Sequence, residues 1–293
     1  MTITADNNGA NVFLAYLASN TEASAAMGGD TEAIAKLVVS LSAGDTAKKT
    51  TNGDFAKDTD FVAKIGDDMY TSLQSAVDAV TPGEETTITL LGNASGDGVK
   101  IPSGNNIIFD LGGFTYTIDG ETVGSTGTET NGFQLLKNSN ITFKNGTITS
   151  EKAKILIQNY SNLTLDNVKL DGTKLNDTVP YTLSNNFGDI TIKDSTIMAH
   201  DNGYAFDVYY WPSNGYTEGV SVTVEGDSKI EGNVQYGSDG TDSGKQNVAE
   251  KASLNITGGT FTGELSLGQI GTSTKAGISI SGGTFQGNDT SNW

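Results

Sequence analysis

One short phrase recurs along most of this chain, and it constrains the fold more than any other feature. The phrase is apolar-x-apolar-x, followed by Gly, Asn or Asp, then a small residue and another apolar side chain. Alternation with period two is typical of a strand with one buried face. The anchors stand about 27 residues apart, which predicts stacked repeats. The phrase starts at Ile88, Phe109, Ile141, Leu163, Ile190, Val222, Leu254 and Ile278.

Two further signals accompany each repeat. Asn, Asp or Gly, which tolerate left-handed backbone, stand where the chain leaves the anchor strand. These residues are Asn145, Asn167, Asp194, Gly226, Gly258 and Gly282. A second strand-like run lies between anchors, and such runs begin at Phe133, Ile155, Tyr181, Tyr204, Asn233 and Glu264. Several strands per repeat predict a solenoid whose coils lie about 4.8 Å apart.

The repeats have a recognisable beginning. The segment YTSLQSAVDAVTP, residues 70–82, predicts a short amphipathic helix that covers the first coil. From VAKIGDDMYTSLQSAVDAVTPGEETTITLLGN to IIFDLGGFTYTIDG, the chain resembles the opening of pectate-lyase-like parallel β-helices. Such β-helices occur in surface proteins of gut Gram-positive bacteria and in phage decoration or fibre proteins. The resemblance, over 61–293, implies an all-β fold: a right-handed parallel β-helix solenoid with an N-terminal capping helix.

Residues 1–60 differ from the repeats. Residues 30–44 place Ile34, Leu37, Val38 and Leu41 on one stripe, which predicts a helix. A shorter helical run starts at Asn11, and the polar residues 45–60 are typical of a linker. We therefore expect two parts: a small helical segment with a linker over 1–60, used for docking or oligomerisation, and a β-helix domain over 61–293.

Composition excludes several classes of function. The formal net charge is −18, there is no Cys, and all 17 positive residues are Lys. A chain this acidic repels nucleic acid and anionic membranes. No disulfide, Cys zinc site or guanidinium clamp can form. No secretory signal and no membrane span are recognisable in the sequence.

The residues for catalysis on acidic glycans are also missing. The resemblance implies an Arg base in lyases, two Asp with an Arg in pectin methylesterases, and Gly-His-Gly with Arg-x-Lys in polygalacturonases. The chain has no Arg, and its one His, His200, has no flanking Gly. Two carboxylates that converge can hydrolyse a neutral glycan. The candidate pairs are Asp189 with Asp194, and His200/Asp201 with Asp207; the alternative is that these acids are solvated surface residues.

The segment from Tyr204 to Tyr216 gathers six aromatic residues. The gap between the second strand and the next anchor grows in the later repeats, so insertions at one corner should build a joint surface. The candidate ligand-binding residues are Tyr209, Tyr210, Trp211, Tyr216 and Tyr236, beside the acidic loop 236–246. Aromatic rings with nearby polar groups suit a sugar ring. The alternative is that these rings only pack the loop onto the solenoid.

A calcium ion is the one cofactor that the sequence suggests. Asp239 and Asp242 stand three apart in a Gly-rich loop and can point at one centre. The spacing does not match an EF-hand loop, and a solvated acidic loop is the alternative.

These observations favour a non-catalytic, surface-exposed structural protein: a virion decoration or fibre protein that adheres to host glycans. One alternative is a bacterial cell-surface adhesin domain, and another is a polysaccharide hydrolase or lyase. The expected location is a virion surface or an extracellular surface. The expected partners are a capsid or cell-wall protein bound through residues 1–60, a glycan at the loop corner, and further copies in a homo-oligomer, with no nucleic acid or membrane.

Overall fold

The computed structural model describes residues 61–212, 216–238, 251–268, 277–286 and 293, together with three short strands nearer the N-terminus. The chain divides into two compact units, Met1–Ala76 and Val77–Trp293. The first unit ends with the start of the short helix, and the second contains all the repeats.

The first unit contains a three-stranded antiparallel sheet in the order β1-β2-β3. Its strands are β1 (Thr2–Thr4), β2 (Thr46–Lys49) and β3 (Phe55–Lys57). Strands β2 and β3 fall within residues 45–60, the stretch expected from the sequence to be a linker. The helices predicted over residues 30–44 and from Asn11 lie outside the described residues.

A hairpin and a helix follow. Strand β4 (Ala63–Ile65) pairs antiparallel with β5 (Asp68–Tyr70). Helix α4 covers only Leu73–Asp78, so the helix predicted over 70–82 is present but shorter at both ends. Its start is set by Ser72, whose Oγ accepts a hydrogen bond of 3.1 Å from the Ser75 backbone N–H, as an N-cap does.

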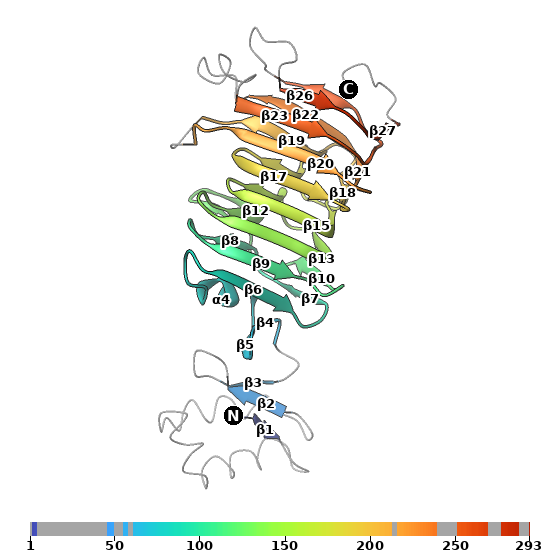
Figure 1. The fold of residues 1–293 in the computed structure, drawn as a ribbon. Coiled ribbons are helices and arrows are strands. Elements are labelled where there is room, and N and C mark those ends of the chain that lie inside the picture. The colour runs from blue at the N-terminus through green and yellow to red at the C-terminus, as the bar shows by residue number, and fades with distance from the viewer. Residues whose placement is uncertain are drawn as a thin grey trace. The chain divides into compact units, whose positions relative to one another are not determined.

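The second unit consists of long parallel rows of strands stacked in chain order, as Figure 1 shows. The first row contains every anchor of the repeat. It runs β6 (Glu85–Leu90), β9 (Asn106–Asp110), β13 (Asn140–Ser150), β15 (Asn162–Asp171), β17 (Gly188–Lys193), β20 (Val220–Glu225), β23 (Ala252–Ile256) and β26 (Ile278–Ile280).

A second sheet collects the strand-like runs that lie between anchors. Its parallel row is β8 (Val99–Ile101), β12 (Thr128–Leu135), β14 (Ile155–Asn159), β16 (Tyr181–Asn185), β19 (Tyr204–Tyr210), β22 (Asn233–Ser238) and β25 (Leu265–Leu267). Strand β11 (Val123–Ser125) pairs antiparallel with β12. All six runs predicted from the sequence are therefore strands of one sheet.

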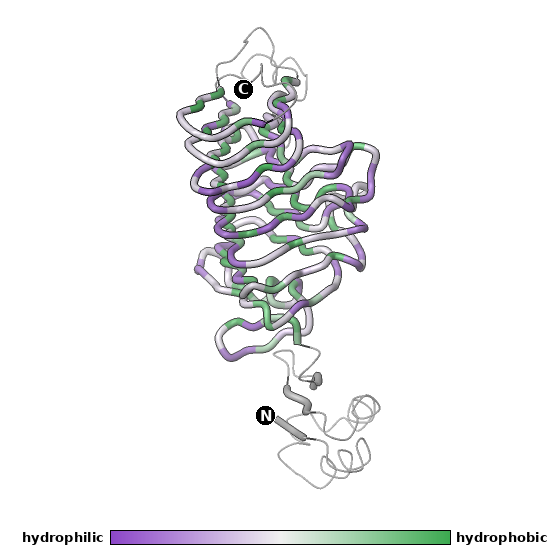
Figure 2. The backbone as a smooth tube through the Cα atoms, turned by 90° about the vertical axis from the view of Figure 1, so that its right-hand side faces the viewer, coloured by the Kyte–Doolittle hydropathy of each residue, from purple (hydrophilic) through white to green (hydrophobic). Residues whose placement is uncertain are grey.

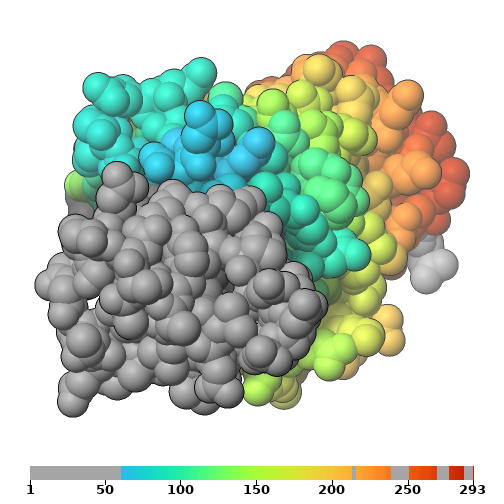
Figure 3. Space-filling model, turned by 90° about the horizontal axis from the view of Figure 1, so that it is seen from below, coloured from blue at the N-terminus to red at the C-terminus, as the bar shows by residue number. Residues whose placement is uncertain are grey.

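A third row branches from the first sheet after the turn residues. It joins β7 (Ala94–Gly96) and β10 (Thr115–Ile118) to the ends of β13 and β15. It continues through β18 (Thr196–Met198), β21 (Lys229–Glu231), β24 (Thr260–Phe261) and β27 (Thr284–Phe285). The space-filling view in Figure 3 follows the same order, from teal near the start of the unit to red near its end.

The register confirms the later anchors and corrects the first two. From Ile141 onward the anchors pair with one another: Ile141 with Leu163, Leu163 with Ile190, and so on to Leu254 with Ile278. Ile88 pairs with Phe109, but Phe109 pairs with Phe143, two residues past the next anchor. A shift of two keeps each side chain on the same face, which is why alternation alone did not reveal it.

The turn residues adopt the left-handed backbone that their identity predicted. Asn145, Asn167 and Asp194 have φ of 58°, 56° and 49°. In the last two repeats the expected Gly258 and Gly282 are not the left-handed residues; the following glycines are, with φ of 92° and 96°. Adjacent turns are cross-linked, because the Asn167 side-chain amide donates to Asn145 Oδ1 at 3.2 Å.

The core lies between the rows. Apolar segments recur in each successive passage of the chain in Figure 2, with hydrophilic turns between them. Rings stack from one repeat to the next, as Phe109 on Phe143 with centroids 4.8 Å apart. A buried amide ladder runs beside them: the Asn159 amide donates to Asn185 Oδ1 at 3.3 Å, and the Asn185 amide donates to the Asp207 carbonyl at 3.0 Å. These bonds satisfy amides that would otherwise be buried without partners.

Candidate functional site

A hollow of about 340 Å³ lies on the second sheet, over β14, β16, β19 and β22. Leu183 and Phe206 pair across β16 and β19 and are fully buried in the core. Because successive side chains on a strand point to opposite faces, their neighbours Ser184 and Asp207 point to the other face. The hollow forms on that face.

Four aromatic residues and a column of polar side chains line this hollow, which we call the aromatic pocket. The polar column follows the pairing of the strands, because Gln158 pairs with Ser184 and Asp207 pairs with Gln235. Among the described residues, the lining is Lys154, Ile155, Gln158, Tyr160, Tyr181, Ser184, Asn186, Asp207, Tyr209, Trp211 and Gln235.

Hydrogen bonds fix the polar groups of the aromatic pocket. The Tyr181 hydroxyl on β16 donates to Gln235 Oε1 on β22 at 3.0 Å, across the intervening strand β19. The Gln158 amide donates to the Tyr160 hydroxyl at 2.8 Å, and Gln158 Oε1 accepts from the Asn131 amide at 2.8 Å. Amides held in this way present defined donors and acceptors, so the pocket is preorganised for a polar ligand.

Asp207 is the one carboxyl group among the described residues of the lining, and only 4% of the residue is exposed. Its Oδ2 accepts from the Ser184 hydroxyl at 3.0 Å, and its Oδ1 accepts from the Asn185 backbone N–H. Both bonds favour the ionised form, yet burial outweighs them and raises the pKa of Asp207 to about 7. The carboxyl therefore changes charge near neutral pH.

Tyr160 and Tyr181 keep their phenolic protons over the same pH range. Burial raises the pKa of Tyr160 to about 12, and burial together with the nearby Asp207 carboxyl raises the pKa of Tyr181 further. Both hydroxyls can then act as hydrogen-bond donors. Tyr181 is held against Tyr204 of the next strand, with the two rings stacked 5.1 Å apart.

The pocket's one cation is already paired. Lys154 Nζ lies 3.2 Å from Asp177 Oδ2. A backbone hydrogen bond from Val179 and the ion pair with Lys154 hold the pKa of Asp177 at about 2. Lys154 is thus directed at a carboxylate outside the lining.

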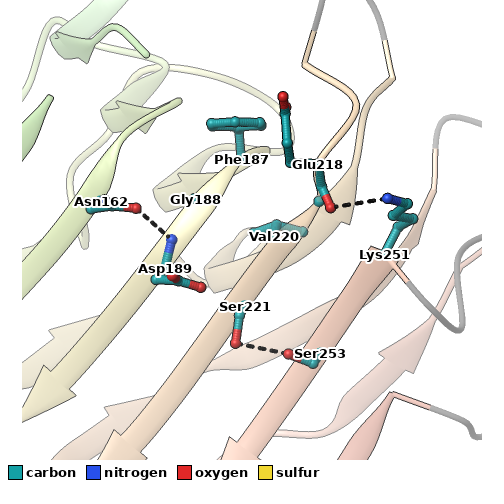
Figure 4. A pocket seen from close by; sticks show the side chains of 10 residues that line it. Asn162, Phe187, Gly188, Asp189, Glu218, Val220, Ser221, Lys251 and Ser253 are labelled. Carbon is teal, nitrogen blue, oxygen red and sulfur yellow. Dashed lines mark hydrogen bonds between the residues drawn. The ribbon is translucent and has the colours of Figure 1, made fainter. Parts of the chain in front are cut away.

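A second hollow of about 270 Å³ lies over the first sheet, near the starts of β17, β20 and β23. In Figure 4, Asp189 and Lys251 border it, and their bonds stay within the sheet edge. The Asp189 backbone N–H donates to Asn162 Oδ1 at 3.0 Å, and Lys251 Nζ donates to the Glu218 carbonyl at 3.4 Å. Its lining contains one aromatic ring, Phe187, so it lacks the ring surfaces of the aromatic pocket.

The structure separates the five aromatic residues predicted to bind a ligand. Tyr209 and Trp211 line the aromatic pocket, and Trp211 is 40% exposed. Tyr210 and Tyr236 are buried, and the Tyr236 hydroxyl donates to the Ala252 carbonyl at 2.8 Å. Tyr216 packs against Tyr160, with centroids 4.8 Å apart. The predicted joint surface with the loop from Tyr236 cannot be followed, because residues 239–250 lie outside the described part.

The candidate acid pairs do not converge. Asp189 lies near the start of β17 and Asp194 directly follows its end, and five residues of strand span about 16 Å. Asp194 Oδ1 instead accepts from the Asp227 backbone N–H at 2.9 Å. Asp201 and His200 belong to the exposed turn before β19, where His200 Nδ1 accepts from the Asn202 N–H at 3.2 Å, whereas Asp207 lies within the strand. This arrangement gives no support to the hydrolase alternative.

The proposed calcium ligands Asp239 and Asp242 lie outside the described residues. Among the residues that the structure does describe, no group of three His, Cys, Asp or Glu side chains could hold a metal ion. In the same residues, no helix is both long and apolar enough to cross a membrane.

Tyr160, Tyr181, Gln158 and Gln235 also line the pocket, and they were not predicted from the sequence. One signal could have found the polar column. Each strand of the second sheet from β12 to β25 has a polar residue directly after a buried apolar one, and these polar residues lie opposite one another in neighbouring strands. They are Gln134, Gln158, Ser184, Asp207, Gln235 and Ser266.

Comparison with known proteins gives no further indication of the site's role, because no protein family, curated protein or solved structure matches this chain. The resemblance to pectate-lyase-like β-helices therefore remains an expectation from the sequence.

Proposed function

We propose that the second unit is a right-handed parallel β-helix that binds a saccharide in the aromatic pocket without cleaving it. Three parallel rows that each receive a strand from successive repeats support the β-helix topology. A right-handed path is the hand that parallel crossover connections take in nearly all proteins.

One observation carries the saccharide assignment: the pocket combines Tyr160, Tyr181, Tyr209 and Trp211 with amide and hydroxyl groups that are held in place. The C–H face of a sugar ring packs on an aromatic ring, while its hydroxyls need donors and acceptors at fixed positions. Such a pocket satisfies both requirements.

The wider role that we propose is adhesion or decoration at an exposed surface. The protein would belong to a virion as a decoration or fibre protein, or to a bacterial surface as an adhesin domain. Residues 1–60 would attach it to a capsid or cell-wall protein. The net charge of −18 supports a ligand that is not a polyanion, since like charges repel.

The test is a glycan array probed with the full chain, followed by titration of each glycan that binds. Trp211→Ala removes a ring that is partly exposed, so folding should be retained while affinity falls by about 1–3 kcal/mol. Trp211→Phe should restore part of the affinity. Ile280→Ala is the matched control, because Ile280 is also an exposed apolar side chain but lies on β26.

The proposal fails if no glycan binds, or if Trp211→Ala and Ile280→Ala bind equally well. Release of shorter saccharides during the titration would contradict its non-catalytic part.

A further inference from the structure

The carboxyl group of Asp207 is the feature of the aromatic pocket that neutral saccharide binding does not use. Among the described residues its side chain takes part in no ion pair, and Lys154, the one cation in the lining, pairs with Asp177. A buried carboxylate without a cation is unfavourable. A ligand that supplied the cation would remove this cost.

The geometry leaves room for such a cation. Asp207 Oδ1 and Oδ2 each accept one hydrogen bond, from the Asn185 N–H and the Ser184 hydroxyl. Each carboxylate oxygen has a second lone pair, so each can accept one more donor. Because Asp207 lines the hollow, a ligand N–H group can approach from that side.

The aromatic rings around Asp207 also favour a positively charged ligand. Tyr160, Tyr181, Tyr209 and Trp211 share the lining with it. The face of an aromatic ring carries partial negative charge and attracts ammonium groups, most strongly where water is excluded. A ring-lined pocket with one buried carboxylate is a chemical match for a cation.

We infer that the aromatic pocket selects a saccharide residue that carries a protonated primary amine over the same residue with a hydroxyl or an acetamide group. This inference rests on the proposed saccharide function and names the class of sugar that the site takes. A primary ammonium fits better than a quaternary one, because only the former can donate hydrogen bonds to Asp207 and Gln235.

Binding of the amine should also release a proton. An ammonium beside Asp207 favours the ionised carboxylate and lowers its pKa from about 7. The other titratable groups that line the pocket are Lys154, Tyr160, Tyr181 and Tyr209. Lys154 is held by Asp177, and burial keeps the pKa values of Tyr160 and Tyr181 far above neutral pH. The pKa of Asp207 is about 7, so we expect the released proton to come from Asp207.

The experiment titrates the full chain with tetramers of glucosamine, of N-acetylglucosamine and of glucose that share one linkage. Calorimetry at pH 6 in two buffers of different ionisation enthalpy counts the protons released, and about 0.15 M salt screens the net charge of the protein. Asp207→Asn is compared with Asp189→Asn, which makes the same Asp-to-Asn change at an exposed position on the same unit.

We expect the wild type and Asp189→Asn to bind the amine tetramer at least tenfold more tightly than the other two, with release of about one proton. Asp207→Asn should bind all three within about twofold and release none. Equal binding of the three tetramers by the wild type would overturn the inference and leave the proposed function intact. If Asp207→Asn still preferred the amine tetramer, the inference would also be overturned, because the net negative charge of the protein would then explain the selectivity. If neither the tetramers nor any glycan on the array binds, the proposed function itself fails.

Discussion

The raised pKa of Asp207 predicts that this one residue makes the protein less stable as pH rises. The substitution Asp207→Asn tests this because it removes the charge with little change in shape. In the variant, Oδ1 can still accept from the Asn185 N–H, and the new amide can donate to the Ser184 hydroxyl oxygen. Packing against the buried neighbours should therefore be preserved.

The sign of the effect follows from the two pKa values of Asp207. The unfolded chain loses this proton near pH 3.8, whereas the folded protein keeps it until about pH 7. Between these values the folded state holds the extra proton, so the free energy of unfolding decreases as pH rises and levels off above about 7. From pH 5 to pH 8 the decrease covers about two pKa units, or about 3 kcal/mol at 1.36 kcal/mol per unit.

The assay is urea unfolding followed by far-ultraviolet circular dichroism at pH 5, 6.5 and 8. Urea is uncharged and leaves electrostatic interactions unscreened. The informative quantity is the stability of Asp207→Asn minus that of the wild type, since titration of every other group cancels in the difference. We expect this difference to grow by about 3 kcal/mol between pH 5 and pH 8.

Asp189→Asn is the control, and its difference from the wild type should stay nearly constant. The reasoning would be refuted if the Asp207→Asn difference also stayed constant over this range. That result would mean that the carboxyl is already ionised at pH 5 in the folded protein, through solvation that its burial does not suggest.

Three further predictions concern the turns, the N-terminal segment and catalysis. Asn167→Ala should destabilise the protein by about 1–2 kcal/mol, because Ala lacks the short polar side chain that lets Asn adopt a φ of 56°, and Asn167→Gly should destabilise it by less, because Gly has no Cβ to strain there; equal unfolding free energies of the two variants would contradict the role of the left-handed turn. A chain that starts at Phe61 should lose self-association in light scattering or attachment to stripped particles, and unchanged behaviour in both would exclude residues 1–60 as the docking segment. The full chain should release no unsaturated product or reducing ends from polygalacturonate, alginate or chondroitin, with or without calcium, and turnover abolished by Asp207→Ala would refute this.

The strands and their grouping could be predicted because the signals are local. The alternation at Ile141, Leu163 and Ile190 fixes which face is buried, and a left-handed Asn or Asp then ends the straight part of the strand. Alternation repeats every two residues and so cannot distinguish registers that differ by two. For this reason the pairing of Phe109 with Phe143 was not predicted.

The aromatic pocket could be predicted only in part, because its residues meet through pairing of strands that are distant in sequence. Tyr209 and Trp211 were identified from their local cluster. Tyr181 joins the pocket through a hydrogen bond to Gln235, 54 residues away. Tyr210 belongs to the same cluster in sequence and Tyr236 begins the predicted loop, yet both are buried, since the direction of a side chain depends on its position along the strand and not on its type.

The buried amide ladder of Asn159 and Asn185 has a consequence for how such a chain can change in length. Sliding one strand by a single residue would turn an amide away from its partner and leave it unsatisfied, at a cost of about 1–3 kcal/mol per group. Duplicating a complete repeat that carries one of these Asn residues keeps each side-chain amide opposite another or opposite the Asp207 carbonyl. The ladder thus permits growth by duplication of whole repeats and penalises single-residue insertions within these strands, while insertions between strands leave it intact.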